Sequence, residues 1–266
     1  MADPPSTAFD PAIASRILNN ERLRVAHGWG EYHNLGDALV VTADAPIARL
    51  NCVTGFHARE RSLDATLDIG FALLRAFDRE PAVELTPLDR PATIRRHLQR
   101  RRLAPSARQQ WLTFNDARVA AALNPQVQVK AADADDARTF TDILAGGTRW
   151  LRRLALSTTL TAMHERGNAF YLAMVEGVAV GCAHLLSTES SAGIYALATL
   201  RAYRRRGVAT ALLARAVKDA RGAGCEVIAL STAAESPAER LFRALGFTPA
   251  FETELWSASA DSAGYR

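Results

Sequence analysis

An arginine-rich turn in the second half of the chain constrains the fold more than any other segment. The turn, Tyr203–Thr210, contains three consecutive arginines and a glycine. It follows an apolar run, Ile194–Leu200, that predicts a strand, and it leads into an amphipathic segment from Val208 that predicts a helix. The first N–H groups of a helix have no partner within the helix, and the helix dipole favours a negative charge beside them. This order of elements predicts an anion-binding turn of the kind that holds a phosphate.

The second half of the chain predicts an α/β fold. The Glu176-Gly177 pair indicates a tight hairpin between two of its strands. The expected strands are Val127–Lys130, Ala169–Val175, Val178–Leu186, Ile194–Leu200, Val227–Leu230 and Phe251–Trp256. The expected helices are Ala134–Leu144, Thr159–Arg166, one from Val208 to the glycines after it, and one from Ser236 to Gly246. Together these elements predict a mixed, mostly antiparallel sheet flanked by helices.

The first half shows the same coarse order of elements. The expected helices are Pro11–Val25, Ser62–Phe77 and Pro91–Arg102, and the expected strands are Ala38–Thr42, Ala48–Thr54, Ala82–Leu85 and Trp111–Phe114. An alanine-rich stretch meets a new strand near Asn124-Pro125. We therefore predict two similar lobes, residues 1–124 and 125–266, related by an internal duplication.

A second motif follows the turn, and the two together resemble the motifs of a known family. The turn has Arg204, Gly207 and Ala209 in the order Arg-x-x-Gly-x-Ala. Further along, the segment Ala238–Phe247 has the pattern Ala-x-x-Leu-Phe-x-x-x-Gly-Phe. This combination resembles the GNAT superfamily of acetyl-CoA-dependent N-acetyltransferases. Either motif alone is short, but the pair with its flanking strands and helices is specific.

The resemblance covers Val127 to Ser257. The first half is similar to a degenerate copy of the same fold, because its corresponding turn, Gly55–Arg61, lacks the loop pattern. The resemblance therefore implies a tandem GNAT protein with one working half. The first lobe is then expected to supply a wall of the substrate cleft and to replace a dimer interface.

The resemblance also implies acetyl-CoA as the cosubstrate. In the family the turn holds the pyrophosphate, and the pantetheine amides pair with the exposed edge of the preceding strand. Carried onto this sequence, the cofactor-binding residues are Leu197, Ala198, Thr199, Arg204, Arg205, Arg206, Gly207, Val208, Ala209 and Thr210. An ordinary solvated turn is the alternative interpretation of the three arginines.

The catalytic residues depart from the family pattern. Many members protonate the leaving thiolate with a tyrosine at the position that Phe242 occupies here. The remaining donors are water and three side chains: Tyr195, Tyr171 and Ser231. We predict Tyr195 as the donor. The strand Ile194–Leu200 has no acid, so we predict His184 on the neighbouring strand as the base, because imidazole titrates near neutral pH. A packed histidine and a core tyrosine are the alternatives.

Composition and charge narrow the classes of partner. The net charge of +4 is mild and the arginines between Arg95 and Arg108 suit a solvated helix face, so we predict no nucleic-acid partner. No apolar stretch approaches the roughly 20 residues that span a bilayer, so we predict no membrane partner. The three cysteines lack metal-ligand spacing, which predicts a reduced, cytoplasmic protein without a metal site. Trp29 and Trp150 are candidates for the wall of a substrate cleft, with core packing as the alternative.

The sequence thus predicts an enzyme that transfers an acetyl group from acetyl-CoA to an amine of a small molecule, peptide or protein. Direct attack in a ternary complex is expected, because neither Cys182 in a strand nor Cys225 in a turn is placed as a nucleophile. The acceptor and the choice between monomer and homodimer stay open. The alternative is a non-catalytic acyl-CoA-binding or regulatory module, which Phe242 and the missing strand acid favour.

Overall fold

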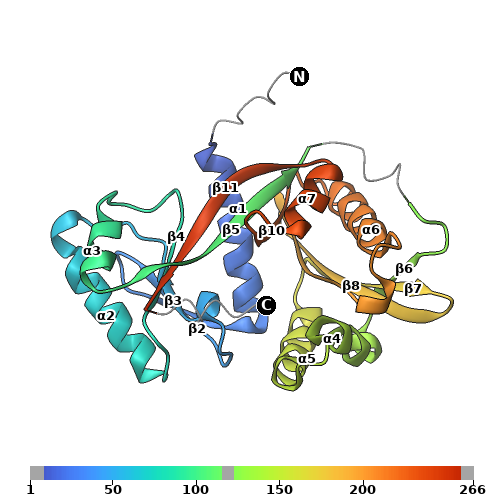
Figure 1. Cartoon of the computed structure of the whole chain (residues 1–266), viewed down its shortest axis with the longest axis horizontal. Helices are drawn as coiled ribbons and strands as arrows, with labels where there is room; N and C mark the ends of the chain where they lie inside the picture. The colour runs from blue at the N-terminus through green and yellow to red at the C-terminus, as the bar shows by residue number, and fades with distance from the viewer. Residues whose placement is uncertain (1–8, 116–122, 259–266) are drawn as a thin grey trace.

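A single sheet runs through both halves of the chain. The computed structural model describes residues 9–115 and 123–258, and across them eleven strands form one sheet in the order β1-β2-β3-β4-β11-β5-β10-β9-β8-β7-β6 (Figure 1). The strands are β1 (Glu31–Asn34), β2 (Leu39–Thr42), β3 (Cys52–Thr54), β4 (Ala82–Leu85), β5 (Ala104–Phe114), β6 (Gln128–Ala132), β7 (Asn168–Val175), β8 (Val178–Ser187), β9 (Ser191–Thr199), β10 (Val227–Ala233) and β11 (Phe247–Ser257). The helices are α1 (Pro11–Arg24), α2 (Leu63–Ala76), α3 (Ile94–Arg100), α4 (Ala137–Ala145), α5 (Arg149–His164), α6 (Val208–Gly222) and α7 (Pro237–Ala244). None of these helices, within the described ranges, is both long enough and apolar enough to cross a membrane.

The last strand of each half pairs with the sheet of the other half. β5 ends the first half but pairs antiparallel with β10, and β11 ends the second half but pairs antiparallel with β4. β5 and β11 also pair with each other, from Phe114–Phe247 to Ala104–Ser257, and run side by side through the middle of the molecule (Figure 1). The last strand of each half therefore extends the sheet of the other half. The predicted boundary between residues 124 and 125 lies in the connection from β5 to β6.

In the second half the sheet lies between α6 on one face and α4 and α5 on the other. Side chains alternate between the faces along a strand. Tyr171 and Ala173 of β7 therefore join the core under α6 with Leu212, whereas Phe170 between them packs with Phe140 of α4. From the first half, α1 packs against β9 and β10 and so brings its side chains to the same sheet. The predicted α/β fold, with a mixed sheet flanked by helices, is confirmed.

Several stretches differ from what the sequence patterns predict, and the expected strand Trp111–Phe114, for example, extends back to Ala104 in β5. The expected strand Ala48–Thr54 is a 3-10 helix, Ala48–Leu50, followed by β3, because the Asn51 side chain hydrogen-bonds the backbone of the preceding turn and bends the chain. Helix α5 starts at Arg149 rather than Thr159, since buried leucine and alanine side chains give its first turns a packed face. The sequence does not predict strand β1, because its four residues include only one apolar side chain, Tyr32, and its two end residues are exposed.

Candidate functional site

Two parallel strands separate in the middle of the second half's sheet. β9 and β10 pair as far as Ile194 and Leu230, where the ladder ends. Beyond this point β9 carries an extra residue opposite β8, and Ala196 has a left-handed backbone with a φ of 51°. Such a bulge increases the local twist and bends the strand that contains it. The backbone of Leu197–Thr199 therefore leaves the β10 ladder, as is required if an extended ligand is to pair with it.

The predicted anion turn lies directly after β9, at the start of α6. Gly207 precedes the helix with a φ of 79°, a left-handed value that glycine adopts without steric cost. The first hydrogen bond of the helix runs from Ala211 N to Gly207 O at 3.0 Å, so the N–H groups of Val208–Thr210 precede the helical ladder. The side chains of Arg204–Arg206 are exposed. The predicted cofactor residues thus lie together, at the end of β9 and the start of α6.

A pocket of about 380 Å³ lies where β9 and β10 have separated. The second half contributes Tyr195–Leu197 of β9, Ser231-Thr232 of β10 and Phe242 of α7. The first half contributes charged, polar and apolar side chains: Glu21, Arg24, Trp29, Ile47, Arg49, Leu50 and Gln109. Trp150, the other tryptophan considered for a cleft wall, is exposed on α5 and lies outside this lining. The association of the two halves therefore forms the pocket.

Tyr195 places a protonated phenol at the pocket. Its hydroxyl donates to Asn20 Oδ1 at 2.7 Å, and Arg24 Cζ lies 4.9 Å from its ring centroid. Burial raises the pKa of Tyr195 well above its ordinary value near 10, and the charge of Glu21 raises it further. The side chain therefore keeps its proton at neutral pH and serves as a hydrogen-bond donor.

His184 places a neutral imidazole next to Tyr195, with ring centroids 5.8 Å apart. The residue is 4% exposed, and its ring stacks on Phe170 at 4.4 Å. Its Nε2 lies 2.7 Å from Asn168 Oδ1, so this nitrogen carries the hydrogen. Burial, with a smaller effect from the charge of Arg24, lowers the pKa of His184 to about 3. The ring is therefore neutral at neutral pH, with its one hydrogen on Nε2.

The other predicted donors are divided between the pocket and the core. Ser231 lines the pocket and accepts a hydrogen bond from Gln109 Nε2. Tyr171 is buried under α6, outside the pocket, and donates to Asp219 Oδ2 at 2.8 Å. Phe242 is buried and lines the pocket at the position where the family often has a tyrosine. The structure thus keeps Ser231 as a candidate donor beside Tyr195 and places Tyr171 elsewhere.

Three charged residues of the first half line the pocket, and no sequence motif predicts that they do. Glu21 and Arg24 form a two-bond ion pair on α1, with Nε–Oε2 and Nη2–Oε1 distances of 2.8 and 2.6 Å. Arg49 donates through Nη1 to Glu84 and, at 3.1 Å, to Thr253 Oγ1. The spacing of Glu21 and Arg24 by one turn signals a helical ion pair, but it says nothing about a pocket.

The corresponding opening in the first half is closed. β3 and β4 are parallel like β9 and β10, but the segments that follow them stay together. Asp89 Oδ1 accepts a hydrogen bond from Phe56 N at 2.8 Å, and Arg90 N donates to Phe56 O at 3.0 Å. A bridge also joins His57 to Arg90, and the Phe56 side chain is fully buried. These contacts occupy the space that in the second half separates β9 from β10.

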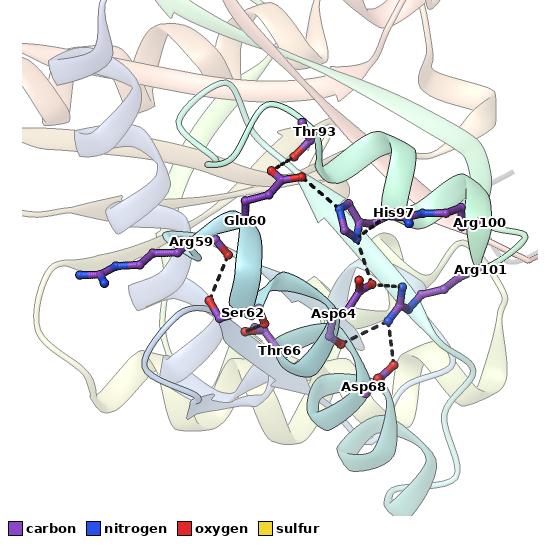
Figure 2. Close-up of polar contacts among 10 residues, drawn as sticks. All are labelled: Arg59, Glu60, Ser62, Asp64, Thr66, Asp68, Thr93, His97, Arg100 and Arg101. Atoms are coloured by element: carbon purple, nitrogen blue, oxygen red, sulfur yellow. Dashed lines mark hydrogen bonds and ion pairs between the residues drawn. The ribbon is translucent and has the colours of Figure 1, made fainter.

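Acidic side chains also occupy the helix start in the first half (Figure 2). Glu60 and Asp64 flank the beginning of α2, and His97 of α3 contacts both, at 3.4 Å through Nε2 and 2.9 Å through Nδ1. Thr93 donates to Glu60, and Arg101 donates to Asp64. Hydrogen bonds from His97 and then Arg101 lower the pKa of Asp64, which favours its charged form. Carboxylates at this position repel a phosphate and instead tie α2 to α3.

A family comparison matches the second half of the chain. Residues 137–247 match the model of the Acetyltransferase (GNAT) family. The match includes the anion turn, α6, β10 and the motif on α7. Among curated proteins, none matches this sequence.

Solved structures resemble the chain over most of its length. A GCN5-related N-acetyltransferase from Kribbella flavida shares 17% identity at a TM-score of 0.71, over 92% of this chain and 95% of that chain. A tandem GNAT protein from the clavulanic acid biosynthesis pathway shares 14% identity at a TM-score of 0.65, over 91% of this chain and 88% of that chain. A GCN5-related N-acetyltransferase from Sphaerobacter thermophilus shares 19% identity at a TM-score of 0.60, over 89% and 84%. Identities this low show a common fold.

The fold and the motifs together define the class of protein. The chain has the two-lobe fold of tandem GNAT proteins. Residues 137–247 form an acetyltransferase domain of the GNAT family, so the resemblance predicted from the turn and the second motif is confirmed. The match of residues 137–247 to this family supports acyl transfer from an acyl-CoA.

Proposed function

We propose that this protein is an N-acetyltransferase that transfers the acetyl group of acetyl-CoA to an amine. The observation that carries the proposal is the separation of β9 from β10 after the Ile194–Leu230 pair. The anion turn follows β9 directly, and residues of both strands line the pocket beyond the separation. A long cofactor with a pyrophosphate along its length and a thioester at its end suits this arrangement.

The cofactor is proposed to lie along β9 with its pyrophosphate at the start of α6. The N–H groups of Val208–Thr210 bind the phosphate oxygens, and Arg204–Arg206 offset their negative charge. The pantetheine amides pair with the backbone of Leu197–Thr199. Gly207 and Ala209 leave the backbone of the turn accessible, because neither has a bulky side chain. The exposed arginines and the left-handed Gly207 support this assignment.

The chemistry is proposed to be a direct attack within a ternary complex. The amine nitrogen adds to the thioester carbonyl carbon, the C–S bond of the tetrahedral intermediate breaks, and the proton lost by nitrogen ends on sulfur. Tyr195 turns its O–H from Asn20 to the leaving sulfur. Full proton transfer from Tyr195 is uphill, since its pKa lies above the value of about 8.5 for a free thiol. Its proposed role is therefore to stabilise the thiolate with a hydrogen bond.

Two groups at the pocket are candidates to take the proton from the amine. We propose His184, whose ring is neutral at rest, although a pKa of about 3 makes it a weak base. Glu21 is the second candidate, because its carboxylate lines the same pocket. The kcat–pH profiles of His184→Gln and Glu21→Gln separate the two, since loss of the base removes the acidic limb of the profile.

A second candidate function is a non-catalytic acyl-CoA-binding or regulatory module. Phe242, which cannot donate a proton, supports this alternative. Calorimetry with CoA and thiol release from acetyl-CoA against a broad amine panel distinguish the two. Binding with thiol release supports the enzyme, and binding without release across the panel supports the module. Failure to bind CoA contradicts both.

We further propose that the protein works in the cytoplasm, as a monomer or a homodimer. Its three cysteines are unpaired and buried, which suits a reducing compartment. Sedimentation of the purified chain separates monomer from homodimer, and cell fractionation tests the location.

A further inference from the structure

One arginine at the pocket has an incomplete set of partners. Arg49 donates to Glu84 and Thr253 through Nη1, whereas its Nη2 is buried and has no hydrogen-bond acceptor among the described residues. A guanidinium presents its donors as a rigid fork that fits the two oxygens of a carboxylate. Buried polar groups are nearly always paired, so an unpaired guanidinium nitrogen in a pocket wall indicates a missing oxyanion.

The same pocket contains a carboxylate that can receive an ammonium group. Glu21 lines the pocket, and its side chain is 27% exposed although Arg24 bonds both of its oxygens. Each carboxylate oxygen can accept more than one hydrogen bond, so capacity for a ligand amine remains. The pocket therefore offers a cation and an anion to one ligand.

The charges around the pocket balance, and this selects the kind of anion. Arg24 is paired with Glu21, and Arg49 is paired with Glu84. A dianionic phosphate bound among these four groups leaves an excess of negative charge. A zwitterion with one carboxylate and one ammonium leaves the balance unchanged. The charge pattern thus favours a carboxylate over a phosphate.

The rest of the lining and the size of the pocket describe the body of the ligand. Five apolar side chains also line it: Trp29, Ile47, Leu50, Phe140 and Leu144. Its volume of about 380 Å³ lies in the range of pockets that enclose small molecules. An apolar side chain of amino-acid size matches these walls.

We propose that the acceptor is a free amino acid, or a similar small aminocarboxylate, with an apolar side chain, and that Arg49 binds its carboxylate. The proposal rests on the proposed function, because the amine of this ligand is the group that is acetylated. Glu84 keeps Nη1 while the guanidinium turns its Nη2 toward the pocket. The ammonium group of the ligand lies near Glu21 and first loses one proton to become a neutral amine. The amine nitrogen then adds to the thioester carbonyl carbon, the C–S bond breaks, the second proton from nitrogen ends on sulfur, and CoA leaves as the free thiol.

The test measures thiol release from acetyl-CoA with acceptors that differ only in the carboxylate. Phenylalanine is compared with phenethylamine, and leucine with isoamylamine. We expect kcat/KM to be at least about tenfold higher for the carboxylate member of each pair, because a site with a charged donor rejects a ligand that leaves it unpaired. Arg49→Lys keeps the charge next to Glu84 but loses the fork, so it raises the KM for phenylalanine about tenfold or more. The Kd for CoA is unchanged.

A matched control is available on α1. Arg16 also has a buried guanidinium nitrogen without an acceptor, Nε, and is paired with Glu226, but it lies outside the pocket lining. Arg16→Lys is expected to leave the KM for phenylalanine within about twofold of the parent. If Arg49→Lys misfolds, the double variant Arg49→Met with Glu84→Gln removes the pair without stranding a charge.

The outcomes separate this proposal from the proposed function. Equal use of the two members of each pair, or an unchanged KM in Arg49→Lys, overturns the role of Arg49 while acetyl transfer stands. If no acceptor is acetylated, phenylalanine and leucine are titrated into the CoA-saturated protein by calorimetry. Binding that Arg49→Lys weakens supports the site, and no binding overturns it. Failure of CoA itself to bind overturns the proposed function instead.

Discussion

The buried imidazole of His184 predicts a stability that falls as the pH drops from 7 to 5. In the folded protein the pKa of His184 is about 3, whereas an unfolded histidine titrates near 6.5. Between these two values the unfolded chain binds a proton that the folded chain does not, so the free energy of unfolding rises with pH. The contribution of the neutral ring is complete above the unfolded pKa and is lost as the pH falls below it.

The size of the loss is set by the unfolded pKa. At pH 5 the solution is about 1.5 units below that pKa, so protonation stabilises the unfolded chain by about 2 kcal/mol, at about 1.4 kcal/mol for each unit. The folded imidazole stays neutral there, because its pKa of about 3 is far lower. His184→Gln can still donate an N–H to Asn168 but has no titratable ring.

Urea unfolding followed by circular dichroism at pH 7 and pH 5 measures the effect. Between these pH values the parent is expected to lose about 2 kcal/mol more stability than His184→Gln. Asp89, whose pKa burial raises to about 6, acts with the opposite sign, since its neutral form stabilises the fold at low pH and this contribution is lost as the pH rises. Asp89 is present in both proteins and cancels in the comparison. The exposed His164 gives the control His164→Gln, which is expected to follow the parent. Equal pH dependence in the parent and His184→Gln would refute a neutral ring.

Three further predictions concern the cofactor and the proton path. Gly207 and Gly224 both have a φ of 79°, so leucine strains the backbone alike at each, but only Gly207→Leu is expected to weaken CoA binding, by about tenfold or more in calorimetry. Equal affinities in the two variants would count against the anion turn. Tyr195→Phe is expected to lower kcat by about tenfold or more, while Phe242→Tyr leaves it within about twofold. A clear rise in kcat with Phe242→Tyr would show that protonation of the leaving thiolate limits the rate and that Tyr195 does not stabilise this thiolate sufficiently. CoA is expected to bind once per chain, because buried Phe56 fills the opening of the first half, and a stoichiometry of two would contradict that interpretation.

The local part of the site was predictable from sequence. The turn before α6 needs a glycine where the backbone is left-handed, and Gly207 supplies it. Ser236 begins α7 as a cap, and its Oγ accepts a hydrogen bond from Glu239 N at 3.1 Å. The Glu176-Gly177 hairpin between β7 and β8 forms where its residues predict. Each of these features depends on residues a few positions apart, so a contiguous pattern records it.

The pairing of strands was not predictable in the same way. Alternation of apolar residues specifies which face of a strand is buried, but not which strand lies beside it. The exchange that places β5 next to β10 and β11 next to β4 joins residues more than 100 positions apart, such as Leu112 with Leu230 and Glu254 with Leu85. The bulge at Ala196 that bends β9 is likewise a property of the register between two strands.

The sequence by itself determined the family of the second lobe and the position of the glycine turn before α6, because residues that are neighbours in the sequence specify a turn and the start of a helix. Only the tertiary structure decided which side chains of the first half line the pocket beside β9 and β10. Glu21 and Arg24 come from α1 and Arg49 from a 3-10 helix, and only the packing of the first lobe on β9 and β10 brings them to Tyr195 and His184. That packing is the sum of many weak contacts between distant parts of the chain, so no short pattern carries it.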